Sequence, residues 1–470
     1  MPSDKAGIIP RLRPRSAFPT QPVAPLNERP MSTALRPSAC PGLLRIVPAL
    51  DGGICRIKLN GGSISAVQAE AVASAAERFA GGVIEATNRA NLQIRGIGSE
   101  QAALIDSLLA AELGPHTAAG DDVRNLMLSP TAGIDRHMRF DTRALAEQIL
   151  TSLQSHERFH QLSAKFAVQL DGGESLAMLE HPHDLWLSVV ELEGECVLAF
   201  GLAGCPTQAP SGAVRLEDGH ALVIAVLELF LDLARPDQTR MRHLLAEYPV
   251  AGFVAQVAER VPLLSIVSEP RVTNSSVLHS RVLHIGAHPQ RETGRVYVGA
   301  TPPLGRLDPA MLRGAAQLAR ERGDGSLRFT PWQSLLLPDI HEDDAAQVIH
   351  SLESLGLRCS ADDALAHLIA CTGSAGCGKG LSDTKGDALQ LAALLQRHGQ
   401  VFDVHLSGCA RSCAAAHVTP VTLLAVSPGH YDLYFRDAAQ PGFGALHARN
   451  LTIEAVAALL DARSRSSFDA

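Results

Sequence analysis

The sequence predicts an α+β fold made of two related halves, each a β-α-β unit followed by an α/β domain. Residues 63–97 align without a gap to residues 306–340, and both stretches read as a helix followed by a strand-forming run. The later segments that correspond are residues 125–133 with 370–377 and residues 159–173 with 401–413. This repeat predicts two copies of one architecture within the chain.

Length and charge narrow the functional classes. At 470 residues the chain is too long for one small core and should divide into about three or four units. The net charge is −8 and the basic residues are dispersed, so we expect no nucleic-acid partner. The longest apolar run, residues 221–233, contains Glu228 and Asp232, so we expect no membrane-spanning segment.

The N-terminal stretch differs in composition from the rest of the chain. Residues 1–36 contain seven prolines and no apolar segment, which predicts a disordered extension rather than a signal peptide. Free cysteines suit a reducing compartment, so we expect a cytoplasmic protein.

The first β-α-β unit is predicted over residues 37–110. Two strand-like runs, residues 43–47 and 54–59, flank a glycine-containing turn. Ser65 is expected to cap a helix that ends near Phe79.

The strand after this helix differs between the two copies. In the first copy we expect one strand over residues 83–97, whose polar side chains are Arg89, Asn91, Gln93 and Arg95. In the second unit, residues 266–350, Asp308 caps the helix, and the equivalent positions are Trp332, Ser334, Leu336 and Pro338. Only the first half therefore offers cationic groups here.

The α/β domains are predicted over residues 111–265 and 351–470. In the first of them, residues 222–233 and 238–261 are helical by apolar spacing, with Pro236 breaking them apart. We interpret these helices as packing scaffold.

Four of the nine cysteines fall into two short clusters at the ends of strand-like runs. They are Cys371, Cys377, Cys409 and Cys413. Glycines flank both clusters and allow the backbone to wrap closely around a bound group. Four thiolates on such loops suit a [4Fe-4S] cluster.

Three other interpretations of these cysteines compete. The five residues between Cys371 and Cys377 are too many for a zinc knuckle. Disulfides do not suit an odd cysteine count without a secretory signal. Residues 373–380 nearly fit a phosphate-binding loop, but Gly380 stands where a hydroxyl would hold magnesium. The iron-sulfur cluster is favoured, with zinc and the phosphate loop left open.

The cations of the first half predict a binding site for a polyanion. Arg89, Arg124 and Lys165 are its cationic candidates, and Gln93 is the neutral one. Each cation alone is typical of a solvated surface charge. Together they suggest a site between the halves, with the polyanion on one side and the cluster on the other.

The cysteine spacing, Cys-x5-Cys followed by Cys-x3-Cys, resembles the cluster motif of sirohaem-dependent sulfite and nitrite reductases. The first half resembles the same superfamily at residues 87–93 (Thr-x-Arg-x-x-x-Gln), at Arg124-Asn125 and at residues 162–166. The resemblance implies ferredoxin-like β-α-β units and sirohaem-reductase-type α/β domains. It also implies a [4Fe-4S] cluster on the four cysteines and cations that hold the carboxylates of sirohaem.

The sequence departs from the reductases at two of these motifs. Ala164 and Ala167 replace two of the three basic residues around Lys165, and residues 409–413 lack the usual Pro-Asn. The set of cations that fixes sirohaem is therefore thinned, and its retention is left open.

One branch of the superfamily, the precorrin-3B synthases, matches more of the chain. The matching segments are residues 36–47, 51–58, 327–332 and 407–413. This resemblance implies a monooxygenase that hydroxylates precorrin-3A at C20 with γ-lactone formation, in aerobic cobalamin biosynthesis. Arg89, Arg124, Lys165 and Gln93 would bind the substrate, and the cluster would relay electrons singly.

The same resemblance implies further reactants. Dioxygen needs an activating centre, and the branch is associated with a mononuclear non-haem iron, for which Asp403, His405 and His417 are candidate ligands. No intact G-x-G-x-x-G follows a strand, so NADH is expected to reduce a separate reductase that feeds the cluster. The alternatives are a sirohaem-dependent sulfite or nitrite reductase and a non-enzymatic iron-sulfur electron carrier.

Overall fold

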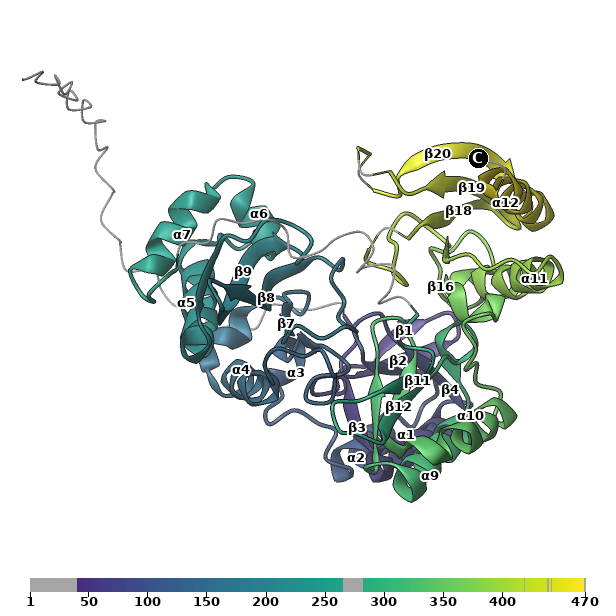
Figure 1. Ribbon diagram of the computed structural model, residues 1–470, viewed down its shortest axis with the longest axis horizontal. Coiled ribbons are helices and arrows are strands. Elements are labelled where there is room, and N and C mark those ends of the chain that lie inside the picture. The colour runs from purple at the N-terminus through teal and green to yellow at the C-terminus, as the bar shows by residue number, and fades with distance from the viewer. Residues whose placement is uncertain (1–39, 265–281, 418, 438, 441, 469–470) are drawn as a thin grey trace, which may run out of the picture. The chain divides into compact units, whose positions relative to one another are not determined.

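The computed structural model describes residues 40–264, 282–417, 419–437, 439–440 and 442–468 (Figure 1). The extension predicted over residues 1–36 lies outside the described residues, as do residues 265–281. The described residues all belong to one compact unit that begins at Arg36. No helix among them is long and apolar enough to cross a membrane.

The described chain forms four five-stranded sheets, two of which are ferredoxin-like. The ferredoxin-like sheets have the strand orders β1-β2-β5-β4-β13 and β11-β12-β15-β14-β3. The strands of the first half are β1 (Val47–Ala49), β2 (Gly52–Ile57), β3 (Ser63–Ser65), β4 (Val83–Ala86) and β5 (Leu92–Ile97). Those of the second half are β11 (Gly286–Pro289), β12 (Arg295–Ala300), β13 (Arg306–Leu307), β14 (Ser326–Phe329) and β15 (Leu335–His341). The predicted α+β fold of two repeated halves is confirmed.

Each ferredoxin-like sheet takes one strand from the other half. β3 of the first half pairs antiparallel with β14, with Ile64 opposite Leu327. β13 of the second half pairs antiparallel with β4, with Leu307 opposite Ile84. These four side chains are buried in one hydrophobic core that both units share. The two units therefore fold as one body, because neither sheet is complete without the other.

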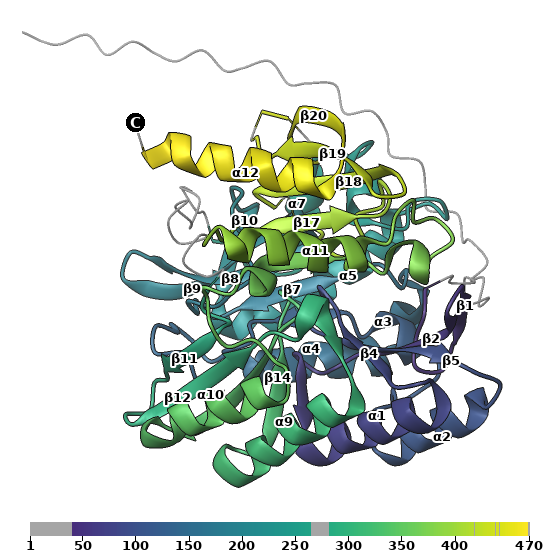
Figure 2. The ribbon, with the colours of Figure 1, turned by 90° about the vertical axis from the view of Figure 1, so that its right-hand side faces the viewer.

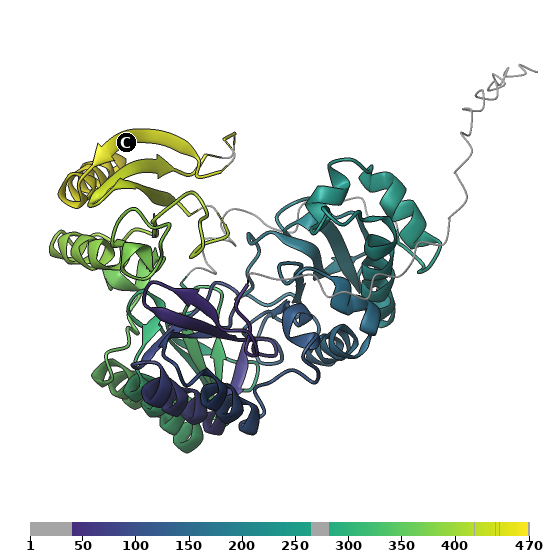
Figure 3. The same ribbon diagram turned by 180° about the vertical axis from the view of Figure 1, so that it is seen from behind.

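The helices of the two units lie in one row beneath these sheets (Figures 1–3). They are α1 (Ala66–Phe79), α2 (Gln101–Ala110), α9 (Pro309–Arg322) and α10 (Ala345–Ser354). Ser65 caps α1 in a reciprocal capping box with Gln68, and Asp308 caps α9, as predicted. Arg313 pairs with Glu77 and Arg320 with Glu70, so ion pairs also join α9 to α1.

The strand predicted over residues 83–97 is wrong, because the chain turns back between β4 and β5 to form a hairpin. The amide of Thr87 donates to the carbonyl of Asn91, and Ala90 adopts φ 54°. The second half has the same turn, in which Thr330 N donates to Ser334 O and Gln333 adopts φ 61°. The repeat therefore extends to a turn that neither copy marks with glycine.

The two α/β domains also repeat one topology. Their sheets have the orders β10-β9-β8-β7-β6 and β16-β17-β18-β19-β20, and in both the first three strands in sequence are parallel and the last two antiparallel. The strands of the first are β6 (Leu126–Leu128), β7 (Val168–Asp171), β8 (His183–Leu192), β9 (Glu195–Gly204) and β10 (Gly212–Arg215). Those of the second are β16 (Leu368–Ala370), β17 (Val404–Ser407), β18 (Val421–Ser427), β19 (His430–Phe435) and β20 (Ala445–Leu451).

Helices cover these sheets. They are α3 (Gly120–Val123), α4 (Arg143–Ser155), α5 (Gly219–Leu233), α6 (Met241–Leu245), α7 (Val250–Ala258), α11 (Thr384–Arg397) and α12 (Ile453–Phe468). α11 and α12 lie side by side over the second sheet (Figure 2). The helix predicted over residues 238–261 is wrong as a single element, because Pro249 cannot donate a backbone hydrogen bond and separates α6 from α7.

The strand predicted over residues 43–47 is also largely wrong, since only Val47 belongs to β1. The amide of Leu44 instead donates to Asp121 Oδ2 at 3.0 Å. The Asp121 carboxylate thus accepts a hydrogen bond that a neighbouring strand would otherwise accept. This bond connects the segment to α3.

Candidate functional site

The four predicted cluster cysteines are brought to one sheet edge. β16 and β17 pair in parallel, so their carboxyl ends meet at the same edge. Cys371 directly follows β16, and Cys409 follows shortly after β17. Desolvation raises the pKa of the Cys413 thiol, and the nearby Cys371, Cys409 and Cys377 raise it further. The four sulfur atoms therefore belong to one electrostatic group.

The backbone around Cys371 is built to receive a thiolate. The amide of Gly408 donates to Cys371 Sγ at 3.2 Å, and Thr384 Oγ1 lies 3.5 Å from the same sulfur. A Cβ on Gly373, which has φ +67°, would lie 2.6 Å from the carbonyl oxygen of Ser382. Donors aimed at a sulfur favour its charged form, and the glycine allows the loop to fold this tightly.

The donor set fits a [4Fe-4S] cluster. A cubane gives each thiolate its own iron, so its ligands stand farther apart than those around a single ion. No three His, Cys, Asp or Glu side chains among the described residues converge closely enough to hold one metal ion. The four thiols on glycine-rich loops supply the number of ligands that such a cluster needs.

The structure argues against the phosphate-binding alternative. The helix that would follow such a loop is α11, and Asp383 caps its N-terminus by accepting from the amide of Gly386. A carboxylate at this position occupies the donors that a phosphate would need and repels it.

Arg89 and Gln93 lie beside an arginine that the sequence analysis missed. With its amide oxygen turned toward Arg56, Gln93 accepts from Arg56 Nε at 3.0 Å. Burial, and then the charges of Arg56 and Arg240, lower the pKa of Arg89 to about 10. Arg240 is held in turn by Asp184, which accepts its Nε at 2.8 Å.

Arg124 lies at the other end of the same line of charges. Its Nη2 donates to Leu113 O at 3.1 Å, and its buried Nε has no hydrogen-bond partner among the described residues. Arg124 and Lys58 line a cavity of about 420 Å³. Burial lowers the pKa of Lys58 to about 7, and the charges of Arg124 and Arg56 contribute to the lowering.

We call these five side chains the cation row: Arg124, Lys58, Arg56, Arg89 and Arg240. Arg56 and Lys58 alternate along one face at the end of β2, a spacing that could have revealed them in the sequence. Arg240 carries no such signal, because it reaches the row only through the fold.

Lys165 is not brought into the cation row. Its side chain is exposed, and its described hydrogen bond is from its own amide to Ser163 Oγ at 3.2 Å. Of the predicted anion-binding residues, Arg89 and Gln93 therefore lie together beside Arg56. Arg124 belongs to the same row of charges through Lys58.

The cation row meets the cysteine loops. Asn88 Nδ2, next to Arg89, donates to the carbonyl of Cys413 at 3.4 Å. Burial lowers the pKa of Arg56, and the charges of Cys40 and Cys413 partly offset that lowering. Cations from the first half and thiols from the second thus share one site.

Buried histidines surround this junction. The rings of His181 and His183 lie 4.8 Å apart, and burial followed by the charge of Arg89 lowers the pKa of His183 to about 3. His181 Nδ1 and His183 Nε2 have no hydrogen-bond partner among the described residues. Both rings are therefore neutral near pH 7.

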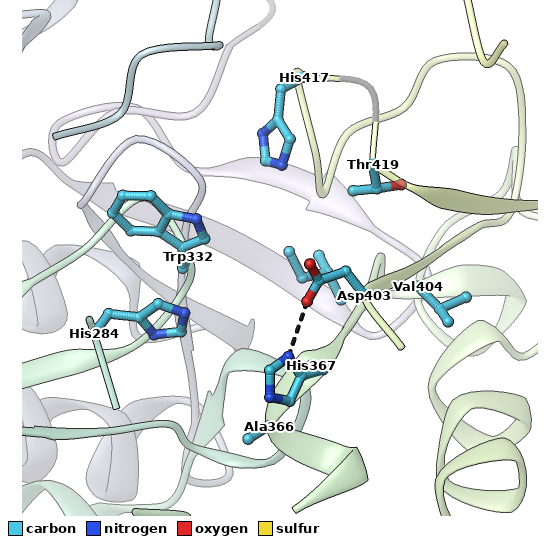
Figure 4. Close-up of a pocket in the computed structure, with 9 residues that line it drawn as sticks. His284, Trp332, Ala366, His367, Asp403, Val404, His417 and Thr419 are labelled. Carbon is cyan, nitrogen blue, oxygen red and sulfur yellow. Dashed lines mark hydrogen bonds and ion pairs between the residues drawn. The ribbon is translucent and has the colours of Figure 1, made fainter. Parts of the chain in front are cut away.

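The proposed iron ligands are not assembled as one site. Burial, then His417, lowers the pKa of His405 to about 3. Asp403 instead pairs with His367, whose Nδ1 lies 2.9 Å from Asp403 Oδ1. His417, Asp403 and His367 line a cavity of about 30 Å³ together with His284 (Figure 4).

Substitution of a cluster cysteine tests the ligand assignment. Cys409→Ser should lose iron and acid-labile sulfide, because a cubane with three thiolates is poorly held. Cys359 is the matched control, since it is a free thiol buried in the hydrophobic core of the ferredoxin-like units and not on the cysteine loops. Metal and sulfide analysis of Cys359→Ser should match the wild type. Equal losses in both variants would contradict the assignment.

The His367–Asp403 pair predicts a pH dependence of stability. Burial alone would lower the pKa of His367, but Asp403 and the carbonyl of Ala361 outweigh it and raise that pKa. The pair therefore stabilises the fold fully below the unfolded pKa of about 6.5 and loses this contribution as pH rises through the higher folded value. Urea titrations should show the wild type losing roughly 1 kcal/mol across this window. Asp403→Asn should lack that step, and a step retained in the variant would refute the pairing.

Family models match both kinds of domain. The description "Nitrite/Sulfite reductase ferredoxin-like half domain" fits residues 48–112 and 288–355. The description "Nitrite and sulphite reductase 4Fe-4S domain" fits residues 119–263, the α/β domain of the first half, and the four cysteines lie beyond that stretch.

Known proteins resemble the chain over most of its length. A chloroplast ferredoxin–nitrite reductase of Zea mays is 31% identical over 391 residues, which are 78% of this chain and 68% of that protein. A precorrin-3B synthase of Sinorhizobium sp is 26% identical over 411 residues, which are 86% of this chain and 84% of that protein. The solved NirA protein of Mycobacterium tuberculosis superposes with a TM-score of 0.71 at 21% identity, covering 88% of this chain and 80% of that one.

The chain spans about two thirds of the chloroplast enzyme and most of the synthase. The matched half domains are the interlocked units that carry the hairpins, and the matched α/β domain carries Arg124 and Lys165. The chain belongs to the nitrite/sulfite reductase family of oxidoreductases.

Proposed function

We propose that the chain is a precorrin-3B synthase, a monooxygenase of aerobic cobalamin biosynthesis that hydroxylates precorrin-3A at C20. The observation that carries the proposal is the contact between the hairpin that carries Arg89 and the cysteine loops, in which Asn88 Nδ2 donates to the carbonyl of Cys413. A polyanionic tetrapyrrole bound by the row would lie directly beside the source of electrons.

The cation row suits a substrate with several carboxylates. Arg124 is buried and Arg89 is partly buried, and a guanidinium shielded from water binds a carboxylate strongly and in fixed orientation. The motif at residues 162–167 contributes little to anion binding, because Lys165 is exposed and its neighbours Ala164 and Ala167 carry no charge. A weaker hold is expected for a substrate that must leave after turnover, and it disfavours a permanently bound sirohaem.

The similarity to the Sinorhizobium protein supports the same proposal. That similarity covers most of both chains, whereas the chloroplast reductase extends well beyond this one. The N-terminal segment that resembles the synthases packs on the Arg124 segment, since Leu44 N donates to Asp121, whose carboxylate lies 3.5 Å from Arg124 Nη2.

The proposed reaction balances with one NADH. Precorrin-3A, O₂, NADH and a proton give the hydroxylated lactone precorrin-3B, NAD⁺ and water. One oxygen atom enters the product at C20, and the other leaves as water with two electrons and two protons. The bound [4Fe-4S] cluster supplies single-electron transfer.

The chain's own residues bind and orient the substrate. Arg89 and Arg124 fix the carboxylates, and the neutral rings of His181 and His183 lie beside Arg89 with unpartnered nitrogens. These nitrogens can form hydrogen bonds with the bound substrate. NADH is proposed to reduce a separate reductase that docks near the cysteine loops.

A labelling experiment tests the function. Protein reconstituted with iron and sulfide is supplied with precorrin-3A, NADH, a reductase and ¹⁸O₂, and the product should gain one labelled oxygen. Arg89→Ala should weaken precorrin-3A binding roughly 10- to 100-fold, since a charged hydrogen-bond partner is lost. Arg215→Ala is the control, because the Arg215 side chain is 72% exposed, and it should bind normally.

The outcomes separate the alternatives. No labelled product from protein with an intact cluster would overturn the synthase proposal. Tight binding that Arg89→Ala abolishes would contradict a non-enzymatic electron carrier.

A second candidate is a sirohaem-dependent reductase of nitrite or sulfite. The identity of 31% with the Zea mays nitrite reductase favours it, and the cation row would equally suit the carboxylates of sirohaem. This candidate requires one sirohaem per chain and reduction of nitrite or sulfite by an artificial one-electron donor.

A further inference from the structure

A group of buried charges joins the first ferredoxin-like unit to the loop that carries Cys371 and Cys377. Its central members are Glu85 on β4, Arg95 on β5 and Lys385 on α11. These three residues are 5–9% exposed. Buried charges interact strongly because little water screens them.

Two cations of this group hold the residues that precede the first two cysteines. Lys385 Nζ donates to the carbonyl of Ala370 at 3.2 Å, directly before Cys371. Arg95 Nη2 donates to the carbonyl of Gly376 at 3.3 Å, directly before Cys377. Both ends of the Cys-x5-Cys segment are therefore fixed by buried cations, one of them from the other half of the protein.

Glu85 balances these cations together with Asp51, which accepts from Arg95 Nε at 2.9 Å. The Glu85 carboxylate lies 3.7 Å from Lys385 Nζ and 3.7 Å from Arg95 Nε, and it accepts from Arg306 Nε at 2.9 Å. Burial would raise the pKa of Glu85, but Lys385, Arg95 and Arg306 outweigh it and lower that pKa, so Glu85 is ionised. Thr372 Oγ1, next to Cys371, also donates to Glu85 at 3.4 Å.

Lys385 also acts on the thiol itself. Burial lowers the pKa of Lys385, whereas the charges of Glu85 and Cys371 raise it. The interaction is mutual, so the ammonium stabilises negative charge on Cys371. Glu85 has the opposite sign and lies 3.7 Å from the same ammonium.

We propose that Lys385 and Glu85 are positioning residues that set the reduction potential of the iron-sulfur cluster through opposed buried charges. Reduction adds one electron, and therefore one negative charge, to a group already bound by four thiolates. A buried cation stabilises that added charge and raises the potential, and a buried anion lowers it. This inference rests on the cluster assignment made above, but not on which substrate receives the electrons.

The test is a spectroelectrochemical titration of the reconstituted holoprotein with dithionite as the electron donor. Lys385→Met should lower the equilibrium constant for one-electron reduction about tenfold, which is 59 mV. Glu85→Gln should shift the potential the other way. Lys379→Met removes an exposed charge from the same loop, and it should change the constant by less than about threefold because water screens it.

The opposite signs distinguish electrostatics from structural damage. Both substitutions leave buried charges unpaired, so a purely structural effect would move the two potentials in the same direction, and that result would overturn the proposal. An unchanged potential in both variants, or a Lys379→Met shift as large as that of Lys385→Met, would overturn it too.

A charge-conserving variant keeps the proposal testable if Lys385→Met fails to bind the iron-sulfur cluster. Lys385→Arg should retain iron and sulfide with a potential near that of the wild type, and a shift as large as that expected for Lys385→Met would contradict the proposal. Failure of the cluster assignment has a different signature, because the wild type itself would then contain no acid-labile sulfide.

Discussion

The exchange of β3 and β13 between the two ferredoxin-like sheets is the constraint on which the site depends. Each exchanged strand completes the sheet of the other half, and one hydrophobic core fills the space between them. Separating the halves would expose this core and leave two sheet edges unpaired, at a large cost in free energy. The exchange therefore fixes the hairpin after β4 against the cysteine loops, which lie more than 280 residues away in sequence.

Within this frame the two copies of the hairpin have diverged. Thr87 and Thr330 form the same turn, but Arg89 stands in one copy where Trp332 stands in the other. Arg89 belongs to the cation row, whereas the indole of Trp332 stacks on His284 at 5.3 Å and lines the small cavity (Figure 4). One hairpin thus presents a cation, and the other packs an indole. The four cluster cysteines show the reverse division, since all of them lie in the second α/β domain.

The sequence predicted the features that have local signals. The gapless repeat identified the two halves, Ser65 and Asp308 marked the helix starts, and the strand-like runs before Cys371 and Cys409 placed both cysteine pairs on loops at strand ends. The break at Pro249 had a signal that could have been used. The turn at Ala90 had none, because an alanine with positive φ cannot be told from any other alanine.

Long-range contacts account for what the sequence could not predict. The strand exchange and the place of Arg240 depend on residues brought together only by folding. Lys165 is a residue that the sequence assigned to the site but the fold leaves outside it, since its motif resembles that of the reductases while its side chain is exposed. A motif specifies which residue type stands at a position, but the packing around it decides whether that residue reaches the site.

We propose that the cation row beside the iron-sulfur cluster receives a tetrapyrrole as a substrate and not as a resident cofactor. The most direct test is an absorption spectrum of anaerobically purified protein, combined with iron and sulfide analysis. The account predicts iron and acid-labile sulfide without sirohaem bands. One sirohaem per chain would contradict it and would identify the protein as a reductase of nitrogen or sulfur oxyanions.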